Sequence, residues 1–502
     1  MYIRIISFCV LSAVFCSCAG TSGSYDNGVQ YYQNPVLGGD YPDPSVIRVG
    51  NEFFMTHSSF EYYPGLLMWR STDLINWERI GFALYKYVGS VWAPDLVKHG
   101  DKWYIYFPAG RKNWVVWASS PEGPWSEPID LQLSGFIDPG HLTDAEGKRY
   151  LYLSKGYIVP LSDDGLSTAG EPVHNYEGWF YPKEWSTECF CLESPKHTFR
   201  NGYYYLTVAQ GGTAGPATSH MITTARATSP YGPFENSPYN PIVRTESRTE
   251  RWWSQGHGTL VDDINGQWWI MYHAYEKGFH TLGRQTLLLP IEWTDDDWFR
   301  VPKGIHSADK ISAPAGEPFA GNTELSDDFS GDKLGLQWQF FKKYEPDRIS
   351  IENGKLRLKA QGRSFEDSSP LLVNACDNHY EAIVEFSFDD GVTTGLTLFY
   401  DEIANARINV NKEQFVVFNQ QSAKNRVQNT LGNQGFLRIL NDNNEVSFFF
   451  SADGNEWTKM DRSIEMTGFN HNVFYGFLSL RVGLYAFGEG NVTFKNFIYR
   501  KL

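Results

Sequence analysis

The sequence predicts an all-β chain in which a five-bladed β-propeller is followed by a β-sandwich. Short β-branched and aromatic runs are separated by Gly, Asn, Asp and Pro, and long helical periodicity is nearly absent. A hairpin pattern recurs through the first two-thirds of the chain, and the last third alternates cleanly between apolar and polar residues. At 502 residues there is room for two domains.

The recurring pattern is a tight turn, a spacer and a pair of bulky residues that enter a strand. Its five copies are Gly50–Phe54, Gly100–Tyr104, Glu146–Tyr150, Asn201–Tyr205 and Asn265–Trp269. Their spacing of roughly fifty residues is the length of a four-stranded propeller blade. A sandwich with ordinary hairpins is the alternative, and the even spacing favours the propeller.

Just upstream of each copy, the expected innermost strand of each blade carries a titratable residue beside Pro or Gly. These residues are Asp43, Asp95, Asp138, Glu193 and His257. In a propeller they converge on the central axis. Bringing several carboxylates together costs electrostatic energy, so the pattern indicates a functional site more than a stabilising one.

Asp43 lies in the pentapeptide Tyr41-Pro42-Asp43-Pro44-Ser45. The two prolines restrict the backbone on both sides of the acid. A rigid carboxylate at the start of a strand suits a catalytic base, because its geometry must be set before its pKa matters. A turn that only starts the strand explains the same residues, as it does for the nearby Asp40.

The composition narrows the function. A net charge of −15 argues against nucleic acid and anionic membrane surfaces as partners. An aromatic content of 16% fits a ligand that stacks on rings, such as a sugar. No zinc pattern, phosphate loop or nucleophile elbow is present. Two classes remain: acid–base hydrolysis of a glycosidic bond, and a hard-cation site, most plausibly for calcium.

The N-terminus reads as a targeting segment. Residues 1–18 resemble a bacterial lipoprotein signal peptide with Cys18 as the lipidated residue, followed by a Ser/Gly-rich tether over residues 19–33. Ordinary secretion is the alternative. The expected location is the cell envelope, in the periplasm or on the outer-membrane surface, with membrane contact only through the lipid anchor. Cys189 and Cys191 are expected to be free or buried thiols.

From Asn34 to about Pro302 the chain resembles the glycoside hydrolases of family 43, which are five-bladed propellers. The motifs that carry the resemblance are distributed along the chain: Tyr41–Ser45, Ser59–Gly65 with Ser71–Trp77, Trp92–Asp95, Ile137–Pro139, Leu192–Pro195, Gly256–Gly258 and Leu282–Gln285.

This resemblance implies a role for each residue. Asp43 is the general base, Glu193 the general acid, and Asp138 tunes the pKa of the acid and orients it. If Glu193 were not the acid, Glu184 or Glu188 would be next. Residues expected to bind substrate are Phe60, Trp92, Asp95, His257 and Arg284, although a turn role is the alternative for Asp95. His257 is also a candidate ligand for a central ion. No cofactor is expected to be required.

The last third reads as a separate domain. The expected boundaries are 34–305 for the propeller, 306–324 for a linker and 325–502 for the second domain. The end of the chain resembles the closing strands of concanavalin-like jelly-roll domains, which family 43 β-xylosidases often carry. We expect this domain to buttress the propeller. Asp327 or Asp328 is a candidate ligand for a structural calcium, and a solvated turn is the alternative.

Together these observations predict an inverting exo-glycosidase. The expected substrate is an oligosaccharide or polysaccharide with a terminal β-D-xylosyl or α-L-arabinofuranosyl unit. A galactose-directed glycosidase of the same family and a non-catalytic carbohydrate-binding lipoprotein are the alternatives. The combination of Asp43, Asp138 and Glu193 argues against a non-catalytic protein.

Overall fold

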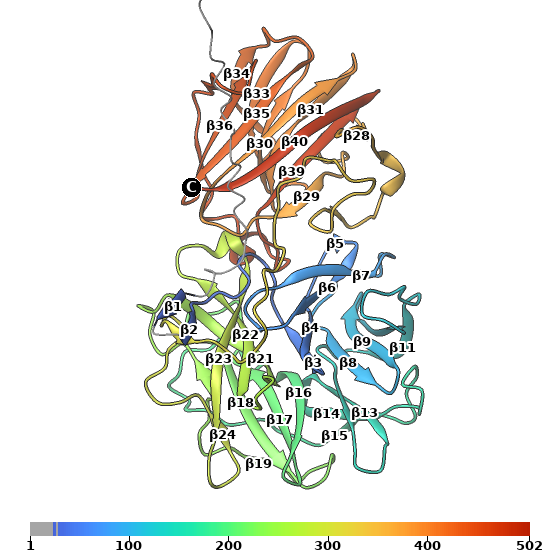
Figure 1. Ribbon diagram of the computed structural model, residues 1–502, viewed down its shortest axis with the longest axis vertical. Coiled ribbons are helices and arrows are strands. Elements are labelled where there is room, and N and C mark those ends of the chain that lie inside the picture. The colour runs from blue at the N-terminus through green and yellow to red at the C-terminus, as the bar shows by residue number, and fades with distance from the viewer. Residues whose placement is uncertain (1–23, 27–28) are drawn as a thin grey trace, which may run out of the picture.

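The computed structural model describes residues 24–26 and 29–502 and has two β domains stacked on each other (Figure 1). The predicted signal peptide, including Cys18, lies outside the described residues. No helix in the described part of the chain is long and apolar enough to cross a membrane. Helix in these residues is limited to the turns η1 (Ser154–Gly156), η2 (His280–Leu282), η3 (Pro346–Arg348) and α1 (His471–Phe474).

Five antiparallel sheets form the propeller. The first blade is β3 (Ser45–Val49), β4 (Glu52–Thr56), β6 (Gly65–Ser71) and β7 (Glu78–Leu84). The second is β8 (Asp95–His99), β9 (Lys102–Ala109), β10 (Lys112–Ala118) and β11 (Ile129–Ser134). The third is β12 (Gly140–Thr143), β13 (Arg149–Leu153), β14 (Tyr157–Pro160) and β15 (Val173–His174). The fourth is β16 (Glu193–Arg200), β17 (Tyr203–Gln210), β18 (Met221–Ala227), β19 (Glu235–Asn236) and β20 (Val243–Arg244). The fifth is β21 (Trp252–Asp262), β22 (Trp268–Glu276), β23 (Arg284–Trp293) and β24 (Phe299–Arg300).

The five predicted hairpins all connect the first and second strands of a blade, and this confirms the predicted fold class. The turns place glycine in the left-handed region, as at Gly50 with φ 65° and Gly266 with φ 80°. An L-residue with a side chain adopts that conformation only at a cost, so the glycine follows from the turn. At least one residue of each bulky pair is buried, and both Phe53 and Phe54 are.

The ring of blades is closed by the chain that precedes the first blade. Asn34 accepts a hydrogen bond from Leu288 N–H (2.8 Å) and donates its side-chain amide to Leu288 O (3.0 Å). Tyr41 N–H donates to Arg284 O (3.2 Å). The segment therefore runs along β23, and it delivers Asp43 to the axis beside the fifth blade. A small sheet of β1 (Ser24–Asp26), β2 (Val29–Tyr32) and β25 (Ile311–Ser312) lies next to this closure.

The second domain is a sandwich of two large antiparallel sheets. One sheet is β34 (Ser422–Gln428), β33 (Gln414–Asn419), β32 (Asn405–Val410), β31 (Val392–Phe399), β39 (Arg481–Gly488), β29 (Leu371–Asn374), β26 (Gln339–Phe341) and β5 (Tyr62–Tyr63). The other is β27 (Ile349–Ile351), β28 (Leu356–Lys359), β40 (Asn491–Lys501), β30 (His379–Phe388), β35 (Gln434–Asp442), β36 (Glu445–Ser451) and β37 (Thr458–Lys459), with β38 (Ile464–Glu465) paired to β36.

The sandwich does more than buttress the propeller. Its first sheet ends on β5, which lies in the connection between β4 and β6 of the first blade, so a segment of the propeller is hydrogen-bonded into the sandwich. Asn374, in β29 of the sandwich, also contacts the loop before Asp43, since its side-chain amide donates to Asp40 O (3.2 Å). The loop after α1 turns back through left-handed residues at Tyr475, Gly476 and Phe477. This turn brings the Phe477 ring to the mouth of the propeller axis.

We predict that Gly140→Ala lowers the melting temperature by several degrees. A Cβ at Gly140 would lie 1.6 Å from the backbone oxygen of Pro195, so the third and fourth blades would have to separate. Overpacking of this kind typically costs about 1–3 kcal/mol. Gly468→Ala is the matched control, because nothing lies within 4 Å of its added Cβ. Equal melting temperatures for the two variants in calorimetry would show that the blades are not in close contact here.

Candidate active site

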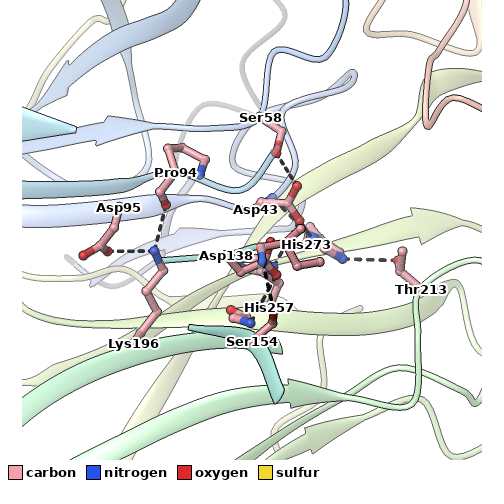
Figure 2. Close-up of polar contacts among 12 residues, drawn as sticks. Asp43, Ser58, Pro94, Asp95, Asp138, Ser154, Lys196, Thr213, His257 and His273 are labelled. Atoms are coloured by element: carbon pink, nitrogen blue, oxygen red, sulfur yellow. Dashed lines mark hydrogen bonds and ion pairs between the residues drawn. The ribbon is translucent and has the colours of Figure 1, made fainter. Parts of the chain in front are cut away.

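A cavity of about 70 Å³ lies where the five blades meet. Most of the predicted site residues line it: Asp43, Phe60, Trp92, Asp138, Glu193, His257 and Arg284. Figure 2 shows Asp43, Asp138, His257 and His273 converging on one point. Phe477, from the sandwich, lines the same cavity.

The backbone is strained where these side chains leave it. Asp43, Asp138 and His257 have φ of 58°, 54° and 56°, in the left-handed region that only glycine adopts freely. Each such residue costs about 1–3 kcal/mol. Three blades use the same costly conformation at equivalent positions. Strain of this kind clusters at functional sites, where it aims side chains at a ligand.

The Asp43 carboxylate is buried and has partners on both oxygens. Arg284 contacts it through both terminal nitrogens, at 3.1 Å to Oδ1 and 3.3 Å to Oδ2. Ser58 Oγ donates to Oδ2. The Nδ1 atoms of His273 and His257 lie 3.0 Å and 3.2 Å from Oδ1.

These contacts set the ionisation of Asp43. Burial raises its pKa, but the Arg284 guanidinium and the two histidines outweigh burial and hold the pKa well below its usual range. Asp43 is therefore a carboxylate at any physiological pH. Burial lowers the pKa of both His257 and His273, and the Asp43 carboxylate opposes this effect.

Asp138 and Glu193 have the opposite environment. Burial is the largest cause of a raised pKa in both groups, and the neighbouring carboxylates raise the pKa further. The pKa of Asp138 is about 7, and the pKa of Glu193 lies well above its usual range. The charge of Asp138 also raises the pKa of Glu193, but by less than burial does. Asp138 Oδ2 accepts a hydrogen bond from Ser194 N–H (3.2 Å) and so fixes the backbone next to Glu193.

Asp95 is the predicted substrate-binding residue that does not line the cavity. Its carboxylate forms a buried ion pair with Lys196 Nζ (2.7 Å) and accepts hydrogen bonds from Ser45 Oγ (3.2 Å) and His141 N–H (2.7 Å). It therefore connects the first four blades. Repeat position alone could not separate Asp95 from the other acids, because the difference comes from Lys196 on the fourth blade.

Several residues of the site were not predicted from the sequence. Thr213, His220 and Phe477 line the cavity, and His273 lies directly behind Asp43. His273 could have been noticed as a lone histidine in the apolar strand β22. Phe477 could not, since nothing in its local sequence links it to a pocket whose other lining residues run from Asp43 to Arg284.

Aromatic rings form the rim. Phe477 lies 6.4 Å from the Phe60 ring and 6.0 Å from the Trp92 ring. The Arg284 guanidinium lies 5.2 Å from the Phe477 ring. Trp92 is 37% exposed, so its ring faces the entrance. The cavity is thus apolar at its mouth and ionic at its floor.

The site's donor atoms do not suit calcium. Asp43, His257 and His273 place one oxygen and two nitrogens within 4.8 Å of one another. Calcium takes six to eight oxygen ligands, and the Arg284 guanidinium already contacts the same Asp43 oxygen. At the other predicted position, Asp327 accepts hydrogen bonds from Phe329 N–H and from the side chains of Gln337 and Trp338.

Two further expectations concern the segment before Glu193. Cys189 and Cys191 form a disulfide, so the expectation of free thiols was wrong. Their Cα atoms are 5.3 Å apart, which is within the usual range for a disulfide, and neither cysteine lies in a strand. Glu188 does not line the cavity, and it accepts a hydrogen bond from Ala214 N–H (2.9 Å).

The comparisons with known proteins agree with this geometry. The model for glycosyl hydrolases family 43 matches residues 32–299. The chain belongs to glycosyl hydrolase family 43. A beta xylosidase C-terminal concanavalin A-like domain matches residues 326–500 of this family 43 chain. The protein is therefore a glycoside hydrolase.

Individual relatives cover almost the whole family 43 chain. A xylosidase/arabinosidase of Humicola insolens is 29% identical, over 93% of this chain and 97% of its own. A non-reducing end alpha-L-arabinofuranosidase of Bacteroides ovatus is 27% identical, over 92% of each. The crystal structure of a family 43 protein from Bacillus licheniformis has a TM-score of 0.85 at 29% identity, and covers 94% of this chain and 100% of its own.

We predict that Asp138→Asn stabilises the protein above neutral pH. The pKa of Asp138 is about 7 in the folded state and about 3.9 in an unfolded chain. Ionisation therefore costs the fold increasing stability from about pH 4 to about pH 7, and the full cost persists above that. The neutral amide of the variant would avoid this cost and still accept the Ser194 hydrogen bond. Melting temperatures at pH 5 and pH 8 test this, and an equal gain at both pH values would contradict it.

Proposed function

We propose that the protein is an inverting exo-glycosidase that releases terminal β-D-xylosyl or α-L-arabinofuranosyl units from plant oligosaccharides or polysaccharides. One observation carries the proposal. A single cavity holds a carboxylate kept ionised, Asp43, and a carboxyl group kept protonated, Glu193. Two carboxyl groups whose environments push their pKa values apart are what acid–base cleavage of a glycosidic bond needs.

In the proposed mechanism, Asp43 takes a proton from a water molecule, which attacks the anomeric carbon. Glu193 donates its proton to the leaving oxygen. Arg284 and His273 hold the base in place, and His257 lies between Asp43 and Asp138, 3.2 Å and 4.0 Å from their oxygens. Asp138 orients the backbone next to the acid. Inverting enzymes place the two carboxyl groups roughly 6.5–9.5 Å apart, which leaves room for the water.

The substrate proposal rests on the cavity and the relatives. The small cavity, covered on one side by Phe477, suits one terminal sugar ring, with Phe60 and Trp92 as stacking surfaces. Relatives of nearly full length are named as a xylosidase/arabinosidase and as an arabinofuranosidase. Because the same fold serves several sugars, the cavity alone does not choose between the two pentoses.

We predict that Asp43→Asn and Glu193→Gln remove activity in different ways. Glu193→Gln should lower kcat on a disaccharide by about 10²–10⁴-fold, the usual contribution of a general acid. It should lower kcat much less on a dinitrophenyl glycoside, whose leaving group needs no proton. Asp43→Asn should impair both substrates, because the attacking water always needs the base.

Glu188→Gln is the matched control, since Glu188 lies five residues before Glu193 and does not line the cavity. Equal losses on both substrates for Glu193→Gln would remove Glu193 from the acid role. The assay contains EDTA, because no cofactor is proposed to be required, and loss of activity there would contradict that point.

A panel of aryl pentosides and hexosides, with NMR of the sugar first released, tests the function itself. The expected result is turnover of a xyloside or arabinofuranoside with inversion at the anomeric carbon. Turnover of a galactoside alone would make the enzyme galactose-directed. No turnover at all would indicate a carbohydrate-binding protein, and a retained anomer would exclude the inverting mechanism.

We also propose that the protein is exported and anchored in the cell envelope through Cys18. The support is the sequence alone, where Cys18 follows an apolar segment and precedes a Ser/Gly-rich stretch. The expected result is that an alkyne-palmitate label enters the wild-type protein in a bacterial host and is lost in Cys18→Ala. Release of an unlabelled wild-type protein into the periplasm would indicate ordinary secretion instead.

A further inference from the structure

The sandwich reaches the active-site cavity through one short segment, residues 470–478. Asn470 caps α1 by accepting a hydrogen bond from Asn472 N–H (3.0 Å), and the turn that follows α1 carries Phe477. Among the described residues, Phe477 is the one from the sandwich that lines the cavity. The position of this single ring therefore decides whether the cavity has a wall on the side of the sandwich.

The backbone of the turn is strained. Tyr475 and Phe477 have φ of 63° and 55°, in the left-handed region that is costly for residues with a side chain. Such angles persist only where the surrounding contacts fix them. The ends of the turn have such contacts, because Tyr400 Oη donates to Tyr475 O and Leu480 N–H donates to Thr281 O (2.8 Å). Phe477 lies between these two points.

His471, the first residue of α1, contacts Phe477 in two ways. Its ring stacks on the Phe477 ring, with centroids 3.6 Å apart and 13° between the planes. Its Nδ1 accepts a hydrogen bond from Phe477 N–H (3.0 Å). The rings of Phe60 and Trp92 lie farther from Phe477, at 6.4 Å and 6.0 Å. His471 does not line the cavity itself, so it contacts the wall from outside.

The protonation state of His471 suits this contact. Nδ1 accepts a hydrogen bond only from the neutral ring, with the proton on Nε2. The pKa of His471 is about 4, because burial lowers it and the positive charge of Arg284 lowers it as well. The ring is therefore neutral at neutral pH. The same Arg284 guanidinium lies 5.2 Å from the Phe477 ring and contacts Asp43, so the wall and the base are close together.

We propose that His471 is a positioning residue of the active site: it holds the Phe477 ring over the cavity, and this ring keeps the terminal sugar against Asp43 and Glu193. The inference rests on the proposed function. Because His471 does not line the cavity, its effect passes through Phe477. Without the imidazole, the Phe477 turn loses its stacking partner and its hydrogen bond, while Asp43 keeps the contact with Arg284. Substrate binding is then weakened more than the chemical step.

The test is a double-mutant cycle on the dinitrophenyl glycoside of the pentose that the aryl glycoside panel identifies. His471→Ala should raise KM by about three- to tenfold, the usual size of an aromatic contact, and change kcat by less than about twofold. Phe477→Ala should raise KM at least as much. In the Phe477→Ala background, His471→Ala should have no further effect, because its partner is absent. An effect of the same size in both backgrounds would overturn the inference.

His379→Ala is the matched control, since His379 is a partly exposed histidine of β30 in the same domain and does not line the cavity. Its KM should equal that of the wild type, and a rise as large as in His471→Ala would overturn the assignment.

Hydrogen–deuterium exchange of the peptide that contains Phe477 tests the contact without any substrate. Faster exchange in His471→Ala than in the wild type supports the inference, and equal exchange overturns it. Failure of the proposed function looks different, because the wild-type protein would then hydrolyse no pentoside while the exchange result would still stand.

Discussion

The buried ion pair between Asp43 and Arg284 joins the first blade to the fifth and sets the charge at the centre of the propeller. Two charges removed from water are tolerated only when they are paired and hydrogen-bonded. Here Ser58, His257 and His273 complete the coordination of the carboxylate. The chain that closes the ring, from Asn34 to Tyr41, is hydrogen-bonded to the strand that carries Arg284. Closure of the fold and ionisation of Asp43 therefore depend on the same contacts.

The rest of the site follows from the uneven distribution of positive charge. Arg284 lies against Asp43, whereas Lys196 is paired with Asp95 instead of Glu193. Asp138 and Glu193 are thus buried next to a carboxylate without a cation of their own at contact distance. Their protonation is the expected response. The same fold keeps one carboxyl group ionised and another protonated a short distance away.

The sandwich adds aromatic surface to this core. It contributes Phe477 over the entrance, and His471 stacks on that ring. Both residues lie outside the strands, in α1 and in the strained turn after it. The ionic floor of the site comes from the inner strands of the propeller and the residues just before them, whereas its rim includes loops, where side chains can change without disturbing the blades.

The amino-acid sequence by itself determined the blades and most of the floor of the site. Turn glycines such as Gly50 and strand pairs such as Phe53 and Phe54 act locally, so a repeat of hairpins can be read from one chain. The flanking Pro or Gly residues also singled out Asp43, Asp138, Glu193 and His257. Only the tertiary structure decided that Asp95 faces Lys196, that His273 supports Asp43 and that Phe477 covers the cavity. Those outcomes depend on which side chain from a distant part of the chain contacts each residue. A local sequence pattern carries no information about contacts between blades or domains.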